Sequence, residues 1–280
     1  MAAQDHSSAA SGDQRLVGAF EPAMRDMLPG PGEQVHAETL LALCLADGVL
    51  EVLEWAREGT GADPAATMWL ASLRWHRLIT GGFPEGAPQP PPRPTDHALK
   101  LILDSGALEV LPGSAEESLA GLTSGEMRLA PRQRADGDRL SRAGTGVGSK
   151  SSEAMEEDAR TTLTEDPALA RIKPIGLVPY VEAEMKRDWA EQAICLTHED
   201  PKLLAAARRL AADLHNAHLR NDAAASQVCG AKTSHLMVEN DGAGADDVRH
   251  ELITVVVEDL GRRWRAAARP DPASPGSRPQ

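Results

Sequence analysis

Apolar residues recur at spacings of three and four along several segments of the chain, which is the period of a helix with one buried face. The first segment, residues 39–57, carries such a stripe and is followed by Gly59. Two further segments open with Asp-Pro, at 63–64 and 200–201, which is typical of an N-cap followed by the first helical residue. The pattern predicts amphipathic helices joined by short polar connectors.

Other segments lack this period. Residues 86–94, GAPQPPPRP, predict an extended connector, because each proline fixes φ and removes a backbone donor. Residues 131–166 are dominated by charge, Gly and Ser, and predict a long irregular segment. The run LITVVVEDL, residues 252–260, fits a buried helix or a short strand, and periodicity does not separate the two.

Both ends of the chain are polar and rich in small residues or proline. We expect residues 1–13 and 269–280 to be disordered tails. Between them, residues 14–268 are long enough for one domain with a buried core.

Composition sharpens the fold class. Only 3% of the 280 residues are aromatic while 41% are hydrophobic, so Leu, Val and Ala must fill the interior. Strands are enriched in aromatic and β-branched residues, and closely packed helices tolerate small ones. We therefore expect an all-α, compact multi-helix bundle. In this bundle Trp55, Trp69 and Trp75 are expected in the core, because they sit at helical spacing and large residues are few.

The net charge of −13 argues against nucleic acid as a partner, since phosphate backbones need a broad basic face. No apolar run approaches the length of a membrane span, and we expect no membrane partner. Three separated cysteines and the absence of a secretory leader pattern favour a reduced protein of the cytoplasm. The oligomeric state does not follow from the sequence.

One glycine-rich segment resembles a phosphate-binding loop. Residues 143–150, AGTGVGSK, offer backbone amides to an anion, but their spacing fits neither the P-loop nor the dinucleotide fingerprint. Taken alone, the segment is best interpreted as a flexible loop.

Several segments together, in order, carry a family resemblance. HAETLLALCLADGVLEVLEWAREG, ATMWLASLRWHRLITGGFP, GVGSK, RIKPIGLVPYV and ICLTHEDPKLLAAARRLAADLH resemble the ADP-ribosylglycohydrolase family over about residues 35–220. The resemblance implies an all-α fold that binds two Mg²⁺ ions. It also implies hydrolysis of the N- or O-glycosidic bond of ADP-ribosylated substrates, so that ADP-ribose or an ADP-ribosylated protein would be the partner.

The resemblance also implies a metal site, which this chain matches incompletely. The family's early Thr-Asp-Asp-Thr motif falls on His36, Ala37, Glu38 and Thr39, so one carboxylate is missing and the other is a glutamate. Glu38 is the candidate catalytic residue, and the candidate metal ligands are His36, Glu38, Thr39, Asp246 and Asp247. The alternative is that Glu38 and Thr39 only begin a helix, where an acidic residue favours the macrodipole.

The substrate side matches more completely. The candidate substrate-binding residues are Gly146, Gly148, Ser149, Lys150 and His198, of which His198 belongs to a Leu-Thr-His motif. A purely structural alternative for His198 is a helix-entry residue just before the Asp200 cap.

These matches leave alternative functions. The chain is either a hydrolase with a modified Mg²⁺ site or a catalytically inactive relative that binds ADP-ribose or a protein. An unrelated helical interaction protein is the third possibility, and it predicts that Glu38, Ser149 and His198 lie far apart.

Overall fold

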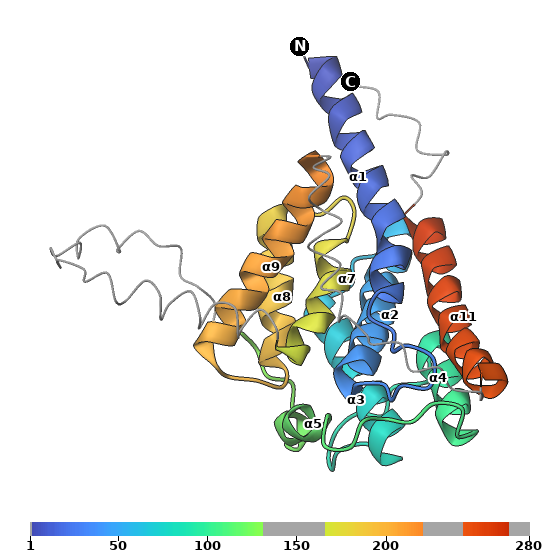
Figure 1. Cartoon of the computed structure of the whole chain (residues 1–280). Coiled ribbons are helices and arrows are strands. Elements are labelled where there is room, and N and C mark those ends of the chain that lie inside the picture. The colour runs from blue at the N-terminus through green and yellow to red at the C-terminus, as the bar shows by residue number, and fades with distance from the viewer. Residues whose placement is uncertain (1, 131–165, 221–242, 269–280) are drawn as a thin grey trace, which may run out of the picture.

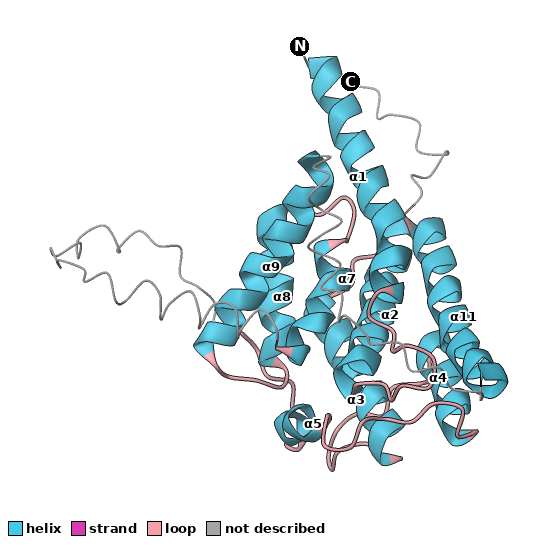
Figure 2. Ribbon diagram, viewed as in Figure 1, coloured by secondary structure: helices cyan, strands magenta, loops and turns pink. Residues whose placement is uncertain are grey.

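The computed structural model describes residues 2–130, 166–220 and 243–268, with side chains described for 11–130, 166–218 and 250–268. Within these ranges the regular structure is helical, apart from an isolated bridge between Val35 and Val110 (Figures 1 and 2). The all-α prediction is confirmed. The segments 131–165 and 269–280, expected to be irregular and disordered, lie outside the described residues.

Helix α2 (Ala37–Arg57) is the centre of the fold, because every residue from Ala37 to Leu50 is buried. A helix that is apolar nearly all round needs neighbours on all sides. Its neighbours are α3 (Pro64–Thr80), α4 (Pro94–Asp104), the 3-10 helix η2 (Pro167–Arg171), α7 (Ile172–Gly176) and α11 (Ala243–Ala267).

Two further groups of helices complete the bundle. Helices α8 (Ala183–Cys195) and α9 (Pro201–Arg220) pack against each other and against α7. The long α1 (Ala2–Arg25) lies along α11 and contacts α9 (Figure 1). Phe20 of α1 stacks on Trp264 of α11 with ring centroids 3.9 Å apart. The short α5 (Glu116–Leu122) contacts α3.

Most predicted helix boundaries are confirmed. Asp63 and Asp200 accept hydrogen bonds of 3.0 Å from the amides of Ala65 and Lys202, as expected of N-caps. The open interpretation of residues 252–260 resolves as helix, inside α11.

Two observations differ from expectation. Helix α1 begins at Ala2, inside the segment expected as a tail, which is rich in alanine, the best helix former. Trp55 was expected in the core, and this prediction is wrong: its side chain is 44% exposed, because it follows the part of α2 that is buried all round. Trp75, in contrast, is fully buried.

No helix in the described part of the chain is both long and apolar enough to cross a membrane.

Candidate functional site

Three of the predicted site residues meet at one cavity. His36, Glu38 and His198 line a space of about 240 Å³ at the N-terminus of α2. Its remaining walls come from the segment around α5 and from the start of η2, namely Gly113, Ser114, Glu116, Glu117, Asp166, Pro167 and Ala168. An unrelated interaction protein predicted that Glu38, Ser149 and His198 lie far apart. That prediction is not supported for Glu38 and His198, and Ser149 lies outside the described residues.

The start of α2 is built by hydrogen bonds that use its first free amides. His36 is the N-cap, and its Nδ1 accepts a hydrogen bond of 3.2 Å from the Glu38 amide. The Ala37 amide donates to Ser114 Oγ at 3.0 Å. The indole of Trp75 donates to the Ala37 carbonyl at 3.0 Å. Since these amides have partners inside the protein, the helix N-terminus is not free to bind an anion.

Glu38 forms a buried ion pair. Its side chain is 6% exposed, and the Arg171 guanidinium, which is fully buried, donates from Nη2 to Oε2. The Ser118 hydroxyl donates to the other oxygen, Oε1, and also accepts from Arg171 at 2.9 Å. Burial alone would raise the pKa of Glu38, but the positive charge of Arg171 and the Ser118 hydrogen bond outweigh it, and the pKa is lowered.

Arg171 also reaches the Leu-Thr-His motif. Its Nη1 donates to Thr197 Oγ1 at 2.7 Å and to the Ala193 carbonyl at 3.3 Å. Thr197 Oγ1 lies 2.7 Å from His198 Nδ1, so a continuous chain of hydrogen bonds joins Glu38 to His198. The other ring nitrogen, Nε2, lies 3.5 Å from the exposed carboxylate of Glu117.

A glycine holds this motif close to α5. A Cβ atom built on Gly121 would lie 2.5 Å from Thr197 Cα and still closer to the Thr197 carbonyl oxygen. Real Cβ atoms do not approach backbone atoms so closely. Gly121 therefore allows α5, which carries Glu117 and Ser118, to press directly on the turn that carries His198.

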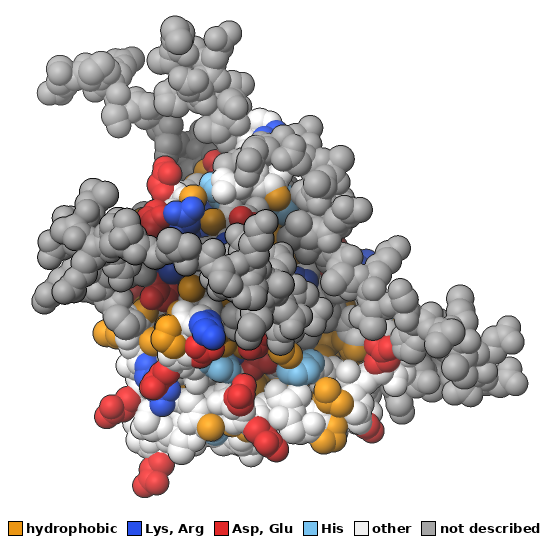
Figure 3. All heavy atoms as spheres, turned by 60° about the vertical axis from the view of Figure 1, so that its left-hand side comes forward, with side chains coloured by type: hydrophobic (Ala, Val, Ile, Leu, Met, Phe, Trp, Pro, Cys, Tyr) orange, Lys and Arg blue, Asp and Glu red, His pale blue; other side chains and the backbone are white. Residues whose placement is uncertain are grey.

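The rim of the cavity is acidic. Glu116, Glu117 and Asp166 contribute carboxylates, whereas the charge of Glu38 is balanced by Arg171. On the lower part of the face that Figure 3 turns forward, histidine side chains lie beside acidic ones. Such a cavity disfavours a phosphate group inside it, because like charges repel more strongly where water is partly excluded.

The described side chains of this site do not fit Mg²⁺ as ligands. Mg²⁺ needs near-octahedral oxygen ligands, usually including one or two carboxylates. Both oxygens of Glu38 already accept hydrogen bonds, residue 37 is alanine, and the Thr39 hydroxyl donates to the Met27 carbonyl at 3.4 Å. Among the residues whose side chains are described, no group of three His, Cys, Asp or Glu is placed to hold a metal ion. The Arg171 guanidinium supplies the positive charge instead.

The other predicted site residues lack described side chains. Gly146, Gly148, Ser149 and Lys150 lie outside the described residues. Asp246 and Asp247 belong to the first turns of α11, where side chains are not described.

Sequence reasoning missed the partners of Glu38 rather than Glu38 itself. In the sequence, Arg171 is the arginine of the RIKPIGL segment. Its apolar neighbours are the one signal that its side chain is buried and pairs with an acid. Ser118 and Thr197 carry no comparable signal, because short polar residues are common in any helix or turn.

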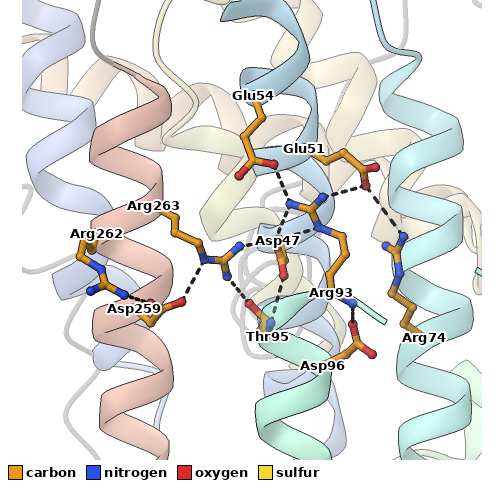
Figure 4. Close-up of polar contacts among 10 residues, drawn as sticks. All are labelled: Asp47, Glu51, Glu54, Arg74, Arg93, Thr95, Asp96, Asp259, Arg262 and Arg263. Carbon is orange, nitrogen blue, oxygen red and sulfur yellow. Dashed lines mark hydrogen bonds and ion pairs between the residues drawn. The ribbon is translucent and has the colours of Figure 1, made fainter. Parts of the chain in front are cut away.

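A second buried acid on α2 lies outside the cavity. Asp47 accepts hydrogen bonds from Arg93 at 2.9 and 3.0 Å, from Arg263 at 2.8 Å and from the Thr95 amide at 3.1 Å (Figure 4). Burial alone would raise its pKa, but the hydrogen bond from Arg263 and the charge of Arg93 lower it. Arg93 directly precedes α4 and Arg263 lies on α11, so this cluster fixes both helices on α2.

Comparison with known proteins gives one family. The model described as ADP-ribosylglycohydrolase matches residues 5–277. No curated protein and no solved structure matches the chain.

Proposed function

Since the chain belongs to the ADP-ribosylglycohydrolase family, we propose that its cavity binds an ADP-ribosyl group without Mg²⁺ and does not cleave it. The resemblance inferred from the ordered segments is confirmed by the family match. Binding without Mg²⁺ and without cleavage belongs to the proposal and not to the family match.

The ion pair between Glu38 and Arg171 is the observation that supports this proposal. A carboxylate that ligates Mg²⁺ must offer an oxygen lone pair to the cation, and each Glu38 oxygen already accepts a hydrogen bond inside the protein, from Ser118 or from Arg171. A second cation beside the fully buried guanidinium would also be repelled. Opening the pair would leave Arg171 buried without a counter-charge, which costs about 3–5 kcal/mol.

The size and charge of the cavity indicate which part of the ligand it takes. A volume of about 240 Å³ lies below the roughly 300–1,000 Å³ of cavities that enclose drug-sized ligands. We therefore place only a ribose inside, beside His36 and His198. The diphosphate would then lie outside the cavity. Its proposed contacts are the candidate residues Gly146, Gly148, Ser149 and Lys150, which lie outside the described residues.

Mg²⁺-dependent hydrolysis is the competing prediction. It requires Glu38 as the catalytic carboxylate, with His36, Thr39, Asp246 and Asp247 completing one or two Mg²⁺ sites. It also requires that Arg171 release Glu38.

Thermal unfolding of the full chain separates the two proposals. We expect ADP-ribose to raise the melting temperature by the same amount with Mg²⁺ and with a chelator, because ligand binding to the folded state stabilises it by mass action. A rise seen only with Mg²⁺ would favour the hydrolase. No rise under either condition would refute both ligand proposals.

An activity assay adds a second test. Ala37→Asp restores the missing acid of the family's early motif, so a hydrolase that lacks only this ligand should gain release of ADP-ribose from an arginine-modified protein. We expect no gain, because Arg171 still occupies Glu38. Ala37→Asn, of similar size but uncharged, controls for the effect of a polar group at this buried position.

A further inference from the structure

We infer that hydrogen bonds behind His36 and His198 fix both imidazoles as the tautomer with hydrogen on Nε2. The cavity would then present two imidazole N–H donors to its ligand. This inference rests on the proposed function only for the identity of the ligand, because the tautomers follow from contacts inside the protein. Thr197 and Arg171 are positioning residues in this arrangement, since they act through His198.

For His36, the argument needs a single contact. The Glu38 amide lies 3.2 Å from His36 Nδ1, and a backbone amide can only donate. Nδ1 must therefore be the acceptor nitrogen without hydrogen. In a neutral imidazole the hydrogen then resides on Nε2, the ring nitrogen that remains for a ligand.

For His198, the Arg171 guanidinium determines which group donates in each hydrogen bond that leads to the imidazole. Arginine has no acceptor, so Thr197 Oγ1 accepts from Arg171 at 2.7 Å. The hydroxyl hydrogen of Thr197 then has two possible acceptors, His198 Nδ1 at 2.7 Å and the Ile194 carbonyl at 3.5 Å. The shorter contact is far the stronger hydrogen bond.

The second ring nitrogen of His198 agrees with this assignment. Nε2 lies 3.5 Å from the Glu117 carboxylate, which attracts an N–H group and repels a bare nitrogen lone pair. Glu38 in turn anchors Arg171 from the opposite side. The ion pair between Glu38 and Arg171 thus orients the imidazole of His198 through Thr197.

The resulting pattern of donors and acceptors defines a class of ligand group. The imidazole N–H groups need acceptors from a ligand, and the Glu117 carboxylate and Asp166 Oδ2 need donors. Asp166 Oδ1 already accepts from the Ala168 amide at 2.8 Å. Neighbouring hydroxyls meet both needs, because each hydroxyl donates and accepts. An ionised phosphate only accepts, so it cannot satisfy the carboxylates.

Nitrogen-15 NMR of the histidine-labelled full chain tests the tautomers directly. At mildly alkaline pH, His36 and His198 should each show a protonated Nε2 and a bare Nδ1. His218 provides an internal reference of opposite type, because its Nδ1 lies 2.8 Å from the Leu214 carbonyl and must carry the hydrogen. His36→Asn and His198→Asn assign the signals. A protonated Nδ1 on either cavity histidine would overturn the inference for that residue.

Thr197→Val tests the role of the hydroxyl, and Thr197→Ser is the matched control that keeps it. In the valine variant we expect the His198 signal to shift towards the other tautomer, with ADP-ribose binding about tenfold weaker, the effect of about one hydrogen bond. The serine variant should keep the wild-type tautomer and bind within about twofold of wild type. An unchanged tautomer in the valine variant would refute the positioning role.

The two proposals fail in different ways. If the tautomers are as expected but no form of the protein binds ADP-ribose, the inference stands and the proposed function fails. If ADP-ribose binds but the valine variant keeps the wild-type tautomer, the proposed function stands and the inference fails.

Discussion

Replacing Arg171 by methionine should destabilise the protein severely. The substitution leaves the buried Glu38 carboxylate with only the Ser118 hydroxyl as a partner, and removes the donor to Thr197. Breaking a buried ion pair in this way costs about 3–5 kcal/mol. This is a large share of the roughly 5–15 kcal/mol by which domains are stable. Urea unfolding near neutral pH, followed by circular dichroism, measures the loss.

A double-mutant cycle isolates the pair from the two side chains. Glu38→Gln combined with Arg171→Met removes both charges, so its loss should be clearly smaller than the sum of the two single losses. Losses that simply add would refute the view that these residues stabilise the protein as a pair.

The pH dependence has a definite sign. The folded-state pKa of Glu38 is lowered below its ordinary value of 4.5, so its stabilising effect is present above that pH and is lost as the pH falls through the folded pKa. The difference in free energy of unfolding between wild type and Arg171→Met should therefore become smaller in acid, where the unpaired carboxylate of the variant is protonated. A gap that stays constant or widens would contradict this assignment.

Three further changes test other parts of the fold. Asp47→Asn should cost about 3 kcal/mol in urea unfolding, because two arginines lose a buried counter-charge. Burial lowers the pKa of Lys186 from 10.5 to about 8, so between these pH values the unfolded chain binds more protons and the free energy of unfolding rises with pH. Lys186→Met should lack this rise of about 3 kcal/mol, which unfolding of both proteins across a pH series measures. Gly121→Ala should cost about 1–3 kcal/mol and weaken ADP-ribose binding, because its methyl group displaces Thr197.

Matched controls make these results interpretable. Arg187→Met removes an exposed helix ion pair, and Asp104→Asn removes another, so each should cost no more than about 0.5 kcal/mol. Gly61→Ala adds a methyl group where nothing lies within 4 Å and should leave ADP-ribose binding unchanged. If Asp47→Asn behaved like Asp104→Asn, the Asp47 cluster would not stabilise the fold as we argue.

The helices could be predicted from the sequence because their signals are local. The Asp-Pro openings at 63–64 and 200–201 place a cap and a first helical residue side by side, and both are observed. The start of α2 at Ala37 also depends on a neighbour in the sequence, His36. Residues 252–260 were undecided because a short apolar run has the same appearance in a buried helix and a buried strand.

The site could be predicted only in part because its chemistry depends on distant contacts. His36, Glu38 and His198, which the motif match selected, line one cavity. That Glu38 is already neutralised could not be read from its own motif, because Arg171 lies 133 residues further along the chain. Trp55 shows the same limitation: helical spacing gives the face of a residue but not where the covering neighbours end.

The two buried acids of α2 also bear on how this chain folds. Glu38 pairs with an arginine 133 residues away. Asp47 pairs with one arginine 46 residues away and with a second one 216 residues away. During synthesis α2 leaves the ribosome long before Arg171 and Arg263, and contacts between such distant residues form slowly. Until these arginines are made, Glu38 has no arginine partner and Asp47 has only Arg93, so the buried pairs of α2 are complete only when nearly the whole chain is present. We expect chains that end before α11 to fold poorly, and to be bound by chaperones and degraded by proteases.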